Sequence, residues 1–336
     1  MKALVLGGTR FIGAHTVRRL VARGFDVTVF HRGTSEAELP AGVHHLHGDR
    51  ARLDDYDADF RRLAPDVVLD LFAMTERNAQ SVIGVFGGIA RRLVVVSSQD
   101  VYRAFGRLIG TEPGPPDPTP LSEASLLRER LYPYRAQAAG PDDFKFDYDK
   151  ILVERAVASD PSLPATILRL PMTHGPGDYQ HRLFPYLKRM DDGRRAILLS
   201  ESAARWRAPR GYVEDVAEAI ALAVADDRAS GRLYNIADRE PLAEVEWVRR
   251  IGRAAGWAGE VVVLADDRMP AHLRMPLDLA QDLAVDSARI RAELGYVEPT
   301  DPDEAMRRTV AWERENPPAE IDPAAFDYAA EDAATA

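Results

Sequence analysis

The sequence predicts an α/β fold: a doubly wound parallel sheet followed by a smaller C-terminal α/β lobe. A short apolar run at 3–6 passes through Gly7 and Gly8 into an apolar-periodic segment at 11–20, a pattern typical of a strand, a tight turn and a helix. Strand-like and helix-like segments then alternate up to residue 170. That alternation indicates a parallel sheet with helices on both faces.

The other elements of the first half follow in the same alternating order. The expected strands lie at 26–30, 43–47, 66–71, 92–97 and 165–170, and the expected helices at 53–63, 78–88 and 150–158. Residues 103–143 interrupt them with a proline-dense loop, and an insertion of this length in a compact domain is usually functional or mobile.

The second half is irregular and mainly helical. Its expected helices lie at 213–225, 242–255, 287–294 and 303–314. We therefore expect residues 1–170 to form the sheet domain, including the loop insertion 103–143, and residues 171–326 to form mainly the smaller lobe. Residues 327–336 are acidic and rich in alanine, which predicts a flexible tail.

Composition excludes several classes of protein. A hydrophobic content of 46% is ample for a core, so the chain is not disordered. Because no apolar run approaches the length of a membrane span and the sequence enters its first strand without a charged leader, we expect a cytoplasmic protein. The absence of cysteine excludes disulfides, thiol catalysis and cysteine-bound zinc. The net charge of −10 argues against a general nucleic-acid binder.

The eight histidines contain no HExxH motif. His44, His45 and His47 fall in the strand-like run 43–47, where alternation would separate them onto two faces. We therefore expect no metal site.

The glycine turn after the first strand predicts a dinucleotide site. A strand that runs through glycines into a helix N-terminus presents backbone N–H groups and the helix dipole to an anion. Gly7 makes the turn and Gly13 lets the helix pack closely on the strand, as in Rossmann folds. Arg10 occupies the usual place of the middle glycine. The expected cofactor-binding residues of this turn are Gly7, Thr9, Arg10, Phe11, Ile12 and Gly13.

The end of the second strand favours NADP over NAD. NAD sites place an acidic residue there to bind the ribose 2′-hydroxyl, whereas this chain has His31, Arg32 and Gly33. Arg32 would meet a 2′-phosphate, and Arg10 points toward the same region. The alternative is that both arginines are solvated surface charges, which leaves NAD open.

The motifs together resemble the extended short-chain dehydrogenase/reductases, the nucleotide-sugar epimerase/dehydratase family. The resemblance rests on the order and spacing of the segments at 7–13, 94–102, 150–154, 168–178, 210–217, 233–236 and 285–296. The Arg10 variant resembles an atypical branch that also includes chloroplast RNA-associated proteins. The family implies a Rossmann-type domain, a substrate lobe and an NAD(P)-dependent epimerase, dehydratase or reductase. Such an enzyme moves hydride to or from a sugar-like or hydroxylated small molecule, and the family allows a homodimer.

The catalytic positions of the family are only partly kept. The family uses a Ser or Thr, a Tyr and a Lys, with the Tyr four residues before the Lys. Ser98 and Lys150 match, but the Tyr position is Phe146, which has no proton to exchange. The family Lys anchors the nicotinamide ribose and lowers the pKa of the phenol, while the Ser polarises the substrate oxygen. Tyr148, Asp100 or a water molecule are the candidates for the missing acid/base.

Further positions follow from the resemblance. Asp49 resembles the residue that contacts the adenine edge, and Phe72 and Ala73 would line the wall beside the nicotinamide ribose, next to Lys150. Arg210 resembles the arginine that meets a diphosphate. Met172 stands where nucleotide-sugar members carry Asn, which weakens that choice of substrate.

His174 follows in the same loop; its ordinary pKa suits proton transfer, but a structural role is favoured. Two alternatives to an enzyme remain. The missing Tyr permits a non-catalytic NADP-binding regulator, and RNA association is disfavoured by the net charge of −10.

Overall fold

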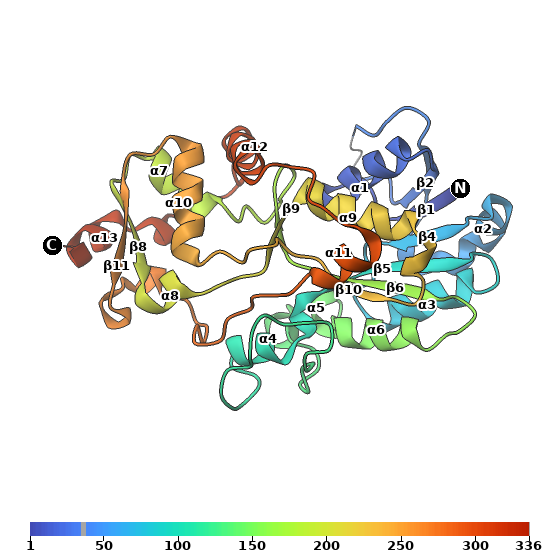
Figure 1. Cartoon of the computed structure of the whole chain (residues 1–336), viewed down its shortest axis with the longest axis horizontal. Helices are drawn as coiled ribbons and strands as arrows, with labels where there is room; N and C mark the ends of the chain where they lie inside the picture. Colours follow the sequence, from blue (N-terminus) through green and yellow to red (C-terminus); the bar gives the residue numbers. More distant parts are fainter. Residues whose placement is uncertain (35–37, 336) are drawn as a thin grey trace.

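The computed structural model describes residues 1–34 and 38–335. Its centre is a parallel sheet of seven strands in the order β10-β6-β5-β4-β1-β2-β3, at the right of Figure 1. The strands are β1 (Lys2–Leu6), β2 (Asp26–His31), β3 (His44–His47), β4 (Val67–Asp70), β5 (Arg92–Ser98), β6 (Ala165–Leu170) and β10 (Leu233–Asn235). Most are continuous apolar runs, as expected of strands that are covered on both faces.

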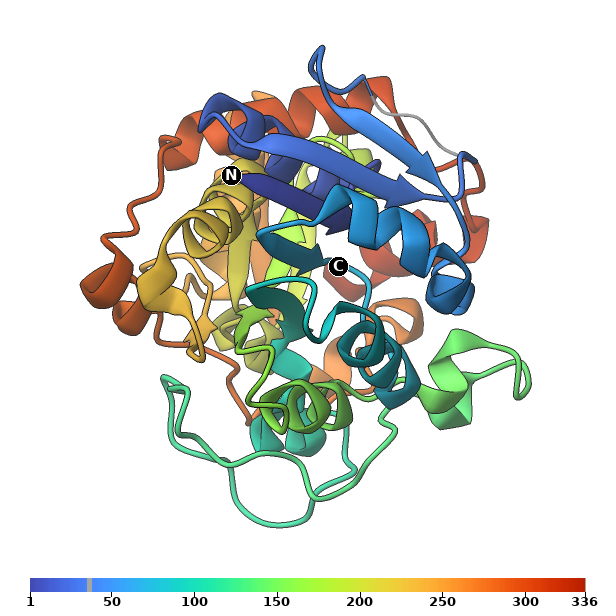
Figure 2. The same ribbon diagram turned by 90° about the vertical axis from the view of Figure 1, so that its right-hand side faces the viewer.

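Two layers of helices cover the sheet, as Figure 2 shows. One layer contains α1 (Phe11–Ala22), α9 (Val213–Ala225) and α11 (Ala288–Leu294), and the other contains α2 (Asp57–Leu63), α3 (Glu76–Phe86) and α6 (Lys150–Ala158). Side chains of β1 alternate between the two cores: Ala3 and Val5 face the first layer, and Leu4 and Leu6 face the second. The predicted doubly wound sheet is confirmed.

The helix expected at 53–63 is divided. Residues Arg50–Tyr56 form a 3₁₀ segment and α2 begins only at Asp57, because Arg52 leaves the helical region at φ −130°. Asp49 caps the 3₁₀ segment by accepting a hydrogen bond from the Ala51 N–H at 2.9 Å.

The central sheet contains strands from both sides of the domain boundary expected at residue 170. Strand β10 pairs in parallel with β6 along Leu233–Asn235, and helices α9 and α11 pack on the same core as α1. A parallel strand cannot follow its neighbour through a short turn, so the chain builds part of the second lobe before it returns with β10.

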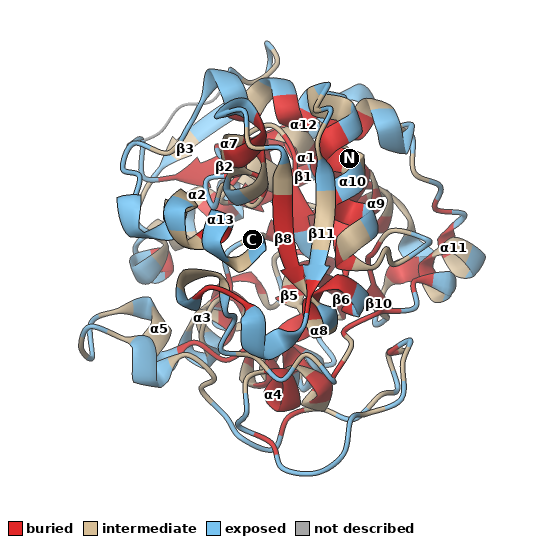
Figure 3. Ribbon diagram, turned by 90° about the vertical axis from the view of Figure 1, so that its left-hand side faces the viewer, coloured by how far each residue is buried: buried red, intermediate tan, exposed pale blue. Residues whose placement is uncertain are grey.

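The second lobe stands beside the carboxyl edge of the sheet (Figure 1). Its elements are α7 (Phe184–Asp191), β8 (Ala196–Ser200), α8 (Glu201–Arg205), α10 (Glu244–Ala255), β11 (Glu260–Leu264) and α12 (Pro302–Glu315). Strands β8 and β11 form a two-stranded parallel sheet, in which β8 is the buried strand (Figure 3). A second pair, β7 (Met172–His174) and β9 (Arg210–Tyr212), connects the lobe to the sheet domain.

The chain end differs from the predicted flexible tail. Residues Tyr328–Thr335 form helix α13, and Glu331 on this helix is only 2% exposed. The Glu331 carboxylate accepts a hydrogen bond from the Arg189 guanidinium of α7 at 2.7 Å. The ion pair holds the helix against the second lobe, and composition alone does not reveal a partner 142 positions away.

The insertion 103–143 begins as helix α4 (Arg103–Leu108) and leads to the short helix α5 (Phe144–Asp147). Between them it is held to the rest of the protein, for example by the Leu121 N–H, which donates to the Ala284 carbonyl at 2.7 Å. No helix within the described residues is both long and apolar enough to cross a membrane.

Candidate active site

The glycine turn has the geometry of an anion site. Gly7 adopts φ +87°, and a Cβ on Gly13 would lie 2.8 Å from the Gly8 Cα, so both positions require glycine. Helix α1 begins at Phe11 with no acidic residue in its first turn, which leaves its positive end suited to a phosphate. These residues fit the pyrophosphate of a dinucleotide.

Two exposed arginines lie at the predicted 2′-phosphate region. Arg10 precedes α1 and Arg32 follows β2. Neither forms an ion pair with another residue in the described part of the chain. Their side chains are therefore available to an anion, although the same exposure is typical of solvated surface charges.

The carboxyl end of β4 joins the predicted nicotinamide wall to Lys150. Phe72 is 53% exposed, and its N–H donates to the buried Asp70 carboxylate at 2.9 Å. The Lys150 ammonium donates to the carbonyls of Ala73, at 2.7 Å, and Val96, at 2.9 Å. Lys150 thus contacts Ala73, next to Phe72 in the chain, and the role of these residues beside a nicotinamide stays a prediction.

Tyr148 and Asp100 meet at the end of β5. The Tyr148 hydroxyl donates to Asp100 Oδ2 at 2.8 Å, and the Tyr134 hydroxyl donates to the same oxygen at 3.2 Å. Ser98 accepts a hydrogen bond from the Asp100 N–H at 3.2 Å. We call Ser98, Asp100, Tyr134, Tyr148 and Lys150 the Asp100 cluster.

The helix start explains how Tyr148 reaches this cluster. Helix α6 begins at Lys150 after the cap Asp149, and Tyr148 is extended, with φ −62° and ψ 119°. Two residues that are two positions apart in one helix point in nearly opposite directions, which would turn Tyr148 away from Lys150. Because Tyr148 lies in extended backbone before the helix, this restriction does not apply to it. Phe146 lies in α5, and its ring faces the Arg135 guanidinium carbon at 4.7 Å.

Burial controls the ionisation of the cluster. Desolvation raises the pKa of Asp100, which favours its protonated form, and burial raises the pKa of Tyr148 well above its usual value. The Lys150 ammonium does not offset this rise in the pKa of Tyr148, because the phenol is shielded from water. Burial lowers the pKa of Lys150 to about 8.

Sequence reasoning missed Tyr134 and Arg128, which both come from the insertion 103–143. The Arg128 guanidinium donates to the Asp100 carbonyl at 2.5 Å and lies 3.5 Å from the Asp149 carboxylate. The proline-dense loop has no periodicity that could show which of its residues turn inward. Its length was the only signal of function.

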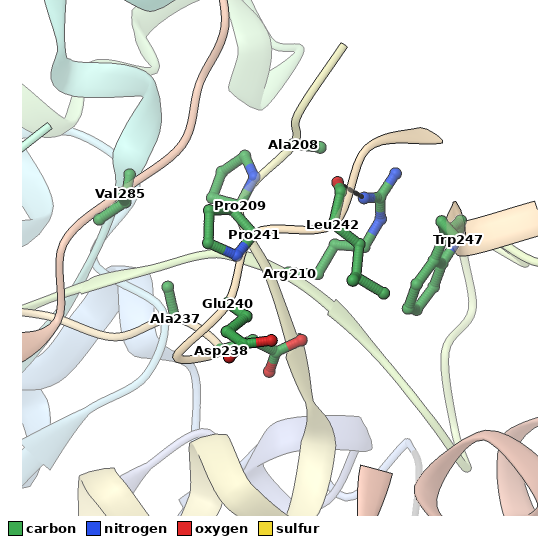
Figure 4. Close-up of a pocket in the computed structure, with 10 residues that line it drawn as sticks. All are labelled: Ala208, Pro209, Arg210, Ala237, Asp238, Glu240, Pro241, Leu242, Trp247 and Val285. Carbon is green, nitrogen blue, oxygen red and sulfur yellow. Dashed lines mark hydrogen bonds between the residues drawn. The ribbon is translucent and has the colours of Figure 1, made fainter. Parts of the chain in front are cut away.

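The predicted substrate residues lie where β7 and β9 meet the second lobe. The Arg210 guanidinium pairs with Glu244 and stacks 4.5 Å from the Trp247 ring centre, beside Leu242 (Figure 4). Met172 is 39% exposed. His174 is buried and contacts the Thr309 hydroxyl at 3.2 Å, and burial lowers its pKa to about 3. His174 is therefore neutral at ordinary pH, in keeping with a structural role.

A second group of carboxyls, buried or half-buried, borders a cavity of about 480 Å³ between the sheet domain and the second lobe. Its lining includes Asp215, Asp238, Glu298 and Arg250. Burial raises the pKa of Asp215 to about 6 and that of Asp238 to about 7. We call this region the acidic cavity.

Comparison with known proteins agrees with this architecture. The chain is 31% identical to the 2′-dehydrokanamycin reductase of Streptomyces kanamyceticus, over 76% of this chain and 67% of that protein. It is 26% identical to a probable dTDP-glucose 4,6-dehydratase of Sinorhizobium fredii, over 94% and 93%. Among solved structures, a UDP-glucose-4-epimerase from Stenotrophomonas maltophila with bound NAD superposes with a TM-score of 0.71 at 18% identity, over 94% and 98%.

The model of the NAD dependent epimerase/dehydratase family matches residues 3–84 and 134–237, more than half of the chain. The two matched segments flank residues 85–133, which carry Ser98, Asp100 and most of the insertion. The resemblance inferred from the motifs is confirmed: the chain belongs to the NAD dependent epimerase/dehydratase family.

Proposed function

We propose that this protein is an NADP-dependent reductase of a keto group on a sugar-like, hydroxylated small molecule, with Tyr148 as the proton donor. The observation that carries the proposal is the 2.8 Å hydrogen bond between the Tyr148 hydroxyl and Asp100, beside Lys150. It supplies an exchangeable proton where the usual family position, Phe146, has none. The reductase among the relatives supports this choice of reaction.

The residues of the Asp100 cluster divide the chemistry among them. When bound, the nicotinamide would supply the hydride. Ser98 would hold the substrate oxygen, and Tyr148 would give it a proton as negative charge develops there. The Asp100 carboxyl, whose pKa is raised by burial, would return a proton to the phenolate. Lys150 would orient the nicotinamide ribose and keep positive charge close to that phenolate.

Replacing Tyr148 tests the proton donor. We expect Tyr148→Phe to lower turnover by about 10²–10⁴-fold, measured as loss of NADPH absorbance over a panel of oxidised sugars that includes an aminoglycoside ketone. NADPH affinity should stay unchanged, because the lost hydroxyl faces Asp100. The matched double variant Tyr148→Phe/Phe146→Tyr should not recover, since position 146 faces Arg135. Full turnover by Tyr148→Phe would overturn the assignment.

Arg32 and the exposed Arg10 support NADP as the cofactor. A guanidinium forms strong, charge-assisted hydrogen bonds with a phosphate group. We expect Arg32→Ala to weaken NADPH binding by about tenfold or more and to leave NADH binding unchanged, measured by titration calorimetry. A clear preference of the wild-type protein for NADH would contradict this part of the proposal.

A further inference from the structure

Three histidines gather at the edge of the central sheet, on strands that β4 and β1 separate from β5 and the Asp100 cluster. His31 is the last residue of β2, and His45 and His47 lie on the edge strand β3. The strand register pairs His31 with His47, and residues two apart on a strand share a face. Alternation does place the histidines of β3 on two faces: His44 lies on one face, and His45 and His47 lie together on the other.

The ring nitrogens of this group are spaced closely enough to share a metal ion. One nitrogen from each of His31, His45 and His47 lies within 4.8 Å of the other two, and His31 Nε2 is 2.9 Å from His45 Nδ1. A tetrahedral ion with metal–nitrogen bonds of about 2.1 Å holds its ligands about 3.4 Å apart. Small rotations of the imidazole rings would bring the observed spacing to that value.

One side of the histidine group is buried in the protein and the other side is exposed to solvent. His31 is 8% exposed, whereas His45 and His47 are exposed on the edge strand. Gly33 turns beside them with φ +75°, and a Cβ there would lie 3.4 Å from the His47 ring. The turn lets the backbone approach the ring closely, and the exposed side leaves space for a water ligand.

We propose that His31, His45 and His47 bind a divalent transition-metal ion, with water at the remaining position. Neutral imidazole nitrogens suit zinc, copper and nickel, whereas magnesium and calcium require oxygen ligands. The ion would lie next to Arg32, at the end of β2. The site differs from the Asp100 cluster in position and in chemistry, and it does not depend on the reaction proposed above.

Metal binding at this site requires a defined exchange of protons. The Gly33 N–H donates to His31 Nδ1 at 3.2 Å, so neutral His31 carries its proton on Nε2 and donates it to His45. When Nε2 binds the metal, the remaining proton moves to Nδ1 and the Gly33 contact is given up. Because protons and the metal compete for the imidazole nitrogens, metal affinity should fall as the pH is lowered.

The test uses the untagged full chain, stripped of metal with a chelator. We expect zinc titrated by calorimetry to bind one ion per chain, and cobalt to give the visible absorption of a nitrogen-ligated site. His45→Gln and His47→Gln should each weaken zinc binding at least tenfold. The matched control His44→Gln, on the opposite face of the same strand, should keep the wild-type affinity.

Both altered ligands are exposed, so the variants should fold, and circular dichroism and thermal melting check this. Should one variant fail to fold, the other still tests the site. The proposal is overturned if the wild-type chain binds no stoichiometric zinc. It is also overturned if the folded His45→Gln and His47→Gln proteins bind zinc as tightly as His44→Gln.

Discussion

The Asp100 cluster and the acidic cavity both remove carboxyl groups from water, but they surround them differently. Burial raises the pKa of Asp100 in one and of Asp238 in the other. Asp100 accepts hydrogen bonds from the hydroxyls of Tyr134 and Tyr148, whereas Asp238 faces the charged Asp215, Glu298, Arg210 and Arg250. A raised pKa therefore reports burial in both regions, and the neighbouring hydroxyls distinguish a proton-transfer site from a buried charge.

The largest expected effect concerns turnover. Asp100→Asn keeps the shape of the carboxyl but removes its exchangeable proton, so we expect the rate to fall by about 10²–10⁴-fold. Asp238→Asn makes the same chemical change in the acidic cavity and should leave the rate within a few-fold of wild type. Steady-state assays of both variants with the same ketone make the comparison. Equal losses in the two variants would show that proton transfer is not confined to the Asp100 cluster.

The cations beside the two regions should differ in their effect on stability. Arg128 and Asp149 are fully buried, 3.5 Å apart, so Arg128→Met leaves a buried carboxylate without its cation and should cost about 3 kcal/mol. The side chain of Arg250 is 26% exposed, and it lies 3.7 Å from Asp303. Arg250→Met should cost less than about 1 kcal/mol. Urea unfolding measures both values, and a reversed order would break the comparison.

The sequence predicts the sheet well because its signals are local. The glycine turn, the apolar runs of β4 and β5 and the α9 helix each depend on neighbours along the chain, and the structure confirms them. The return of β10 to the sheet is different: three residues at Leu233–Asn235 carry little periodicity. Their place is fixed by the free edge of β6, which the sequence does not show.

The candidate site was predicted less completely for the same reason. Ser98 and Lys150 follow from motif spacing. The position of Tyr148 depends on the extended backbone that precedes the first residue of α6, Lys150. Tyr134 reaches Asp100 from a loop without a pattern. His31 joins His45 and His47 only through the pairing of β2 with β3. Contacts between segments far apart in the sequence decide all three.

A smaller effect than the loss of Arg128 is expected for the pH dependence of stability at the acidic cavity. Burial raises the pKa of Asp238 from 3.8 to about 7 in the folded chain, so between these values the folded protein keeps a proton that the unfolded chain has lost. Stability from this group is complete below pH 3.8 and disappears as the pH rises through 7.

An asparagine at position 238 has no proton to lose. We therefore expect Asp238→Asn to gain stability relative to wild type as the pH rises from 4 to 8, by on the order of 1–2 kcal/mol, because Asp238 keeps partial contact with water. Urea unfolding of both proteins across this range measures the gain. A difference that stays constant with pH would show that Asp238 is ionised in the folded protein at acidic pH. Burial would then not change the ionisation of Asp238 from that of a carboxyl in water. The acidic cavity and the Asp100 cluster would then differ both in the pKa of the carboxyl and in the two tyrosines beside Asp100.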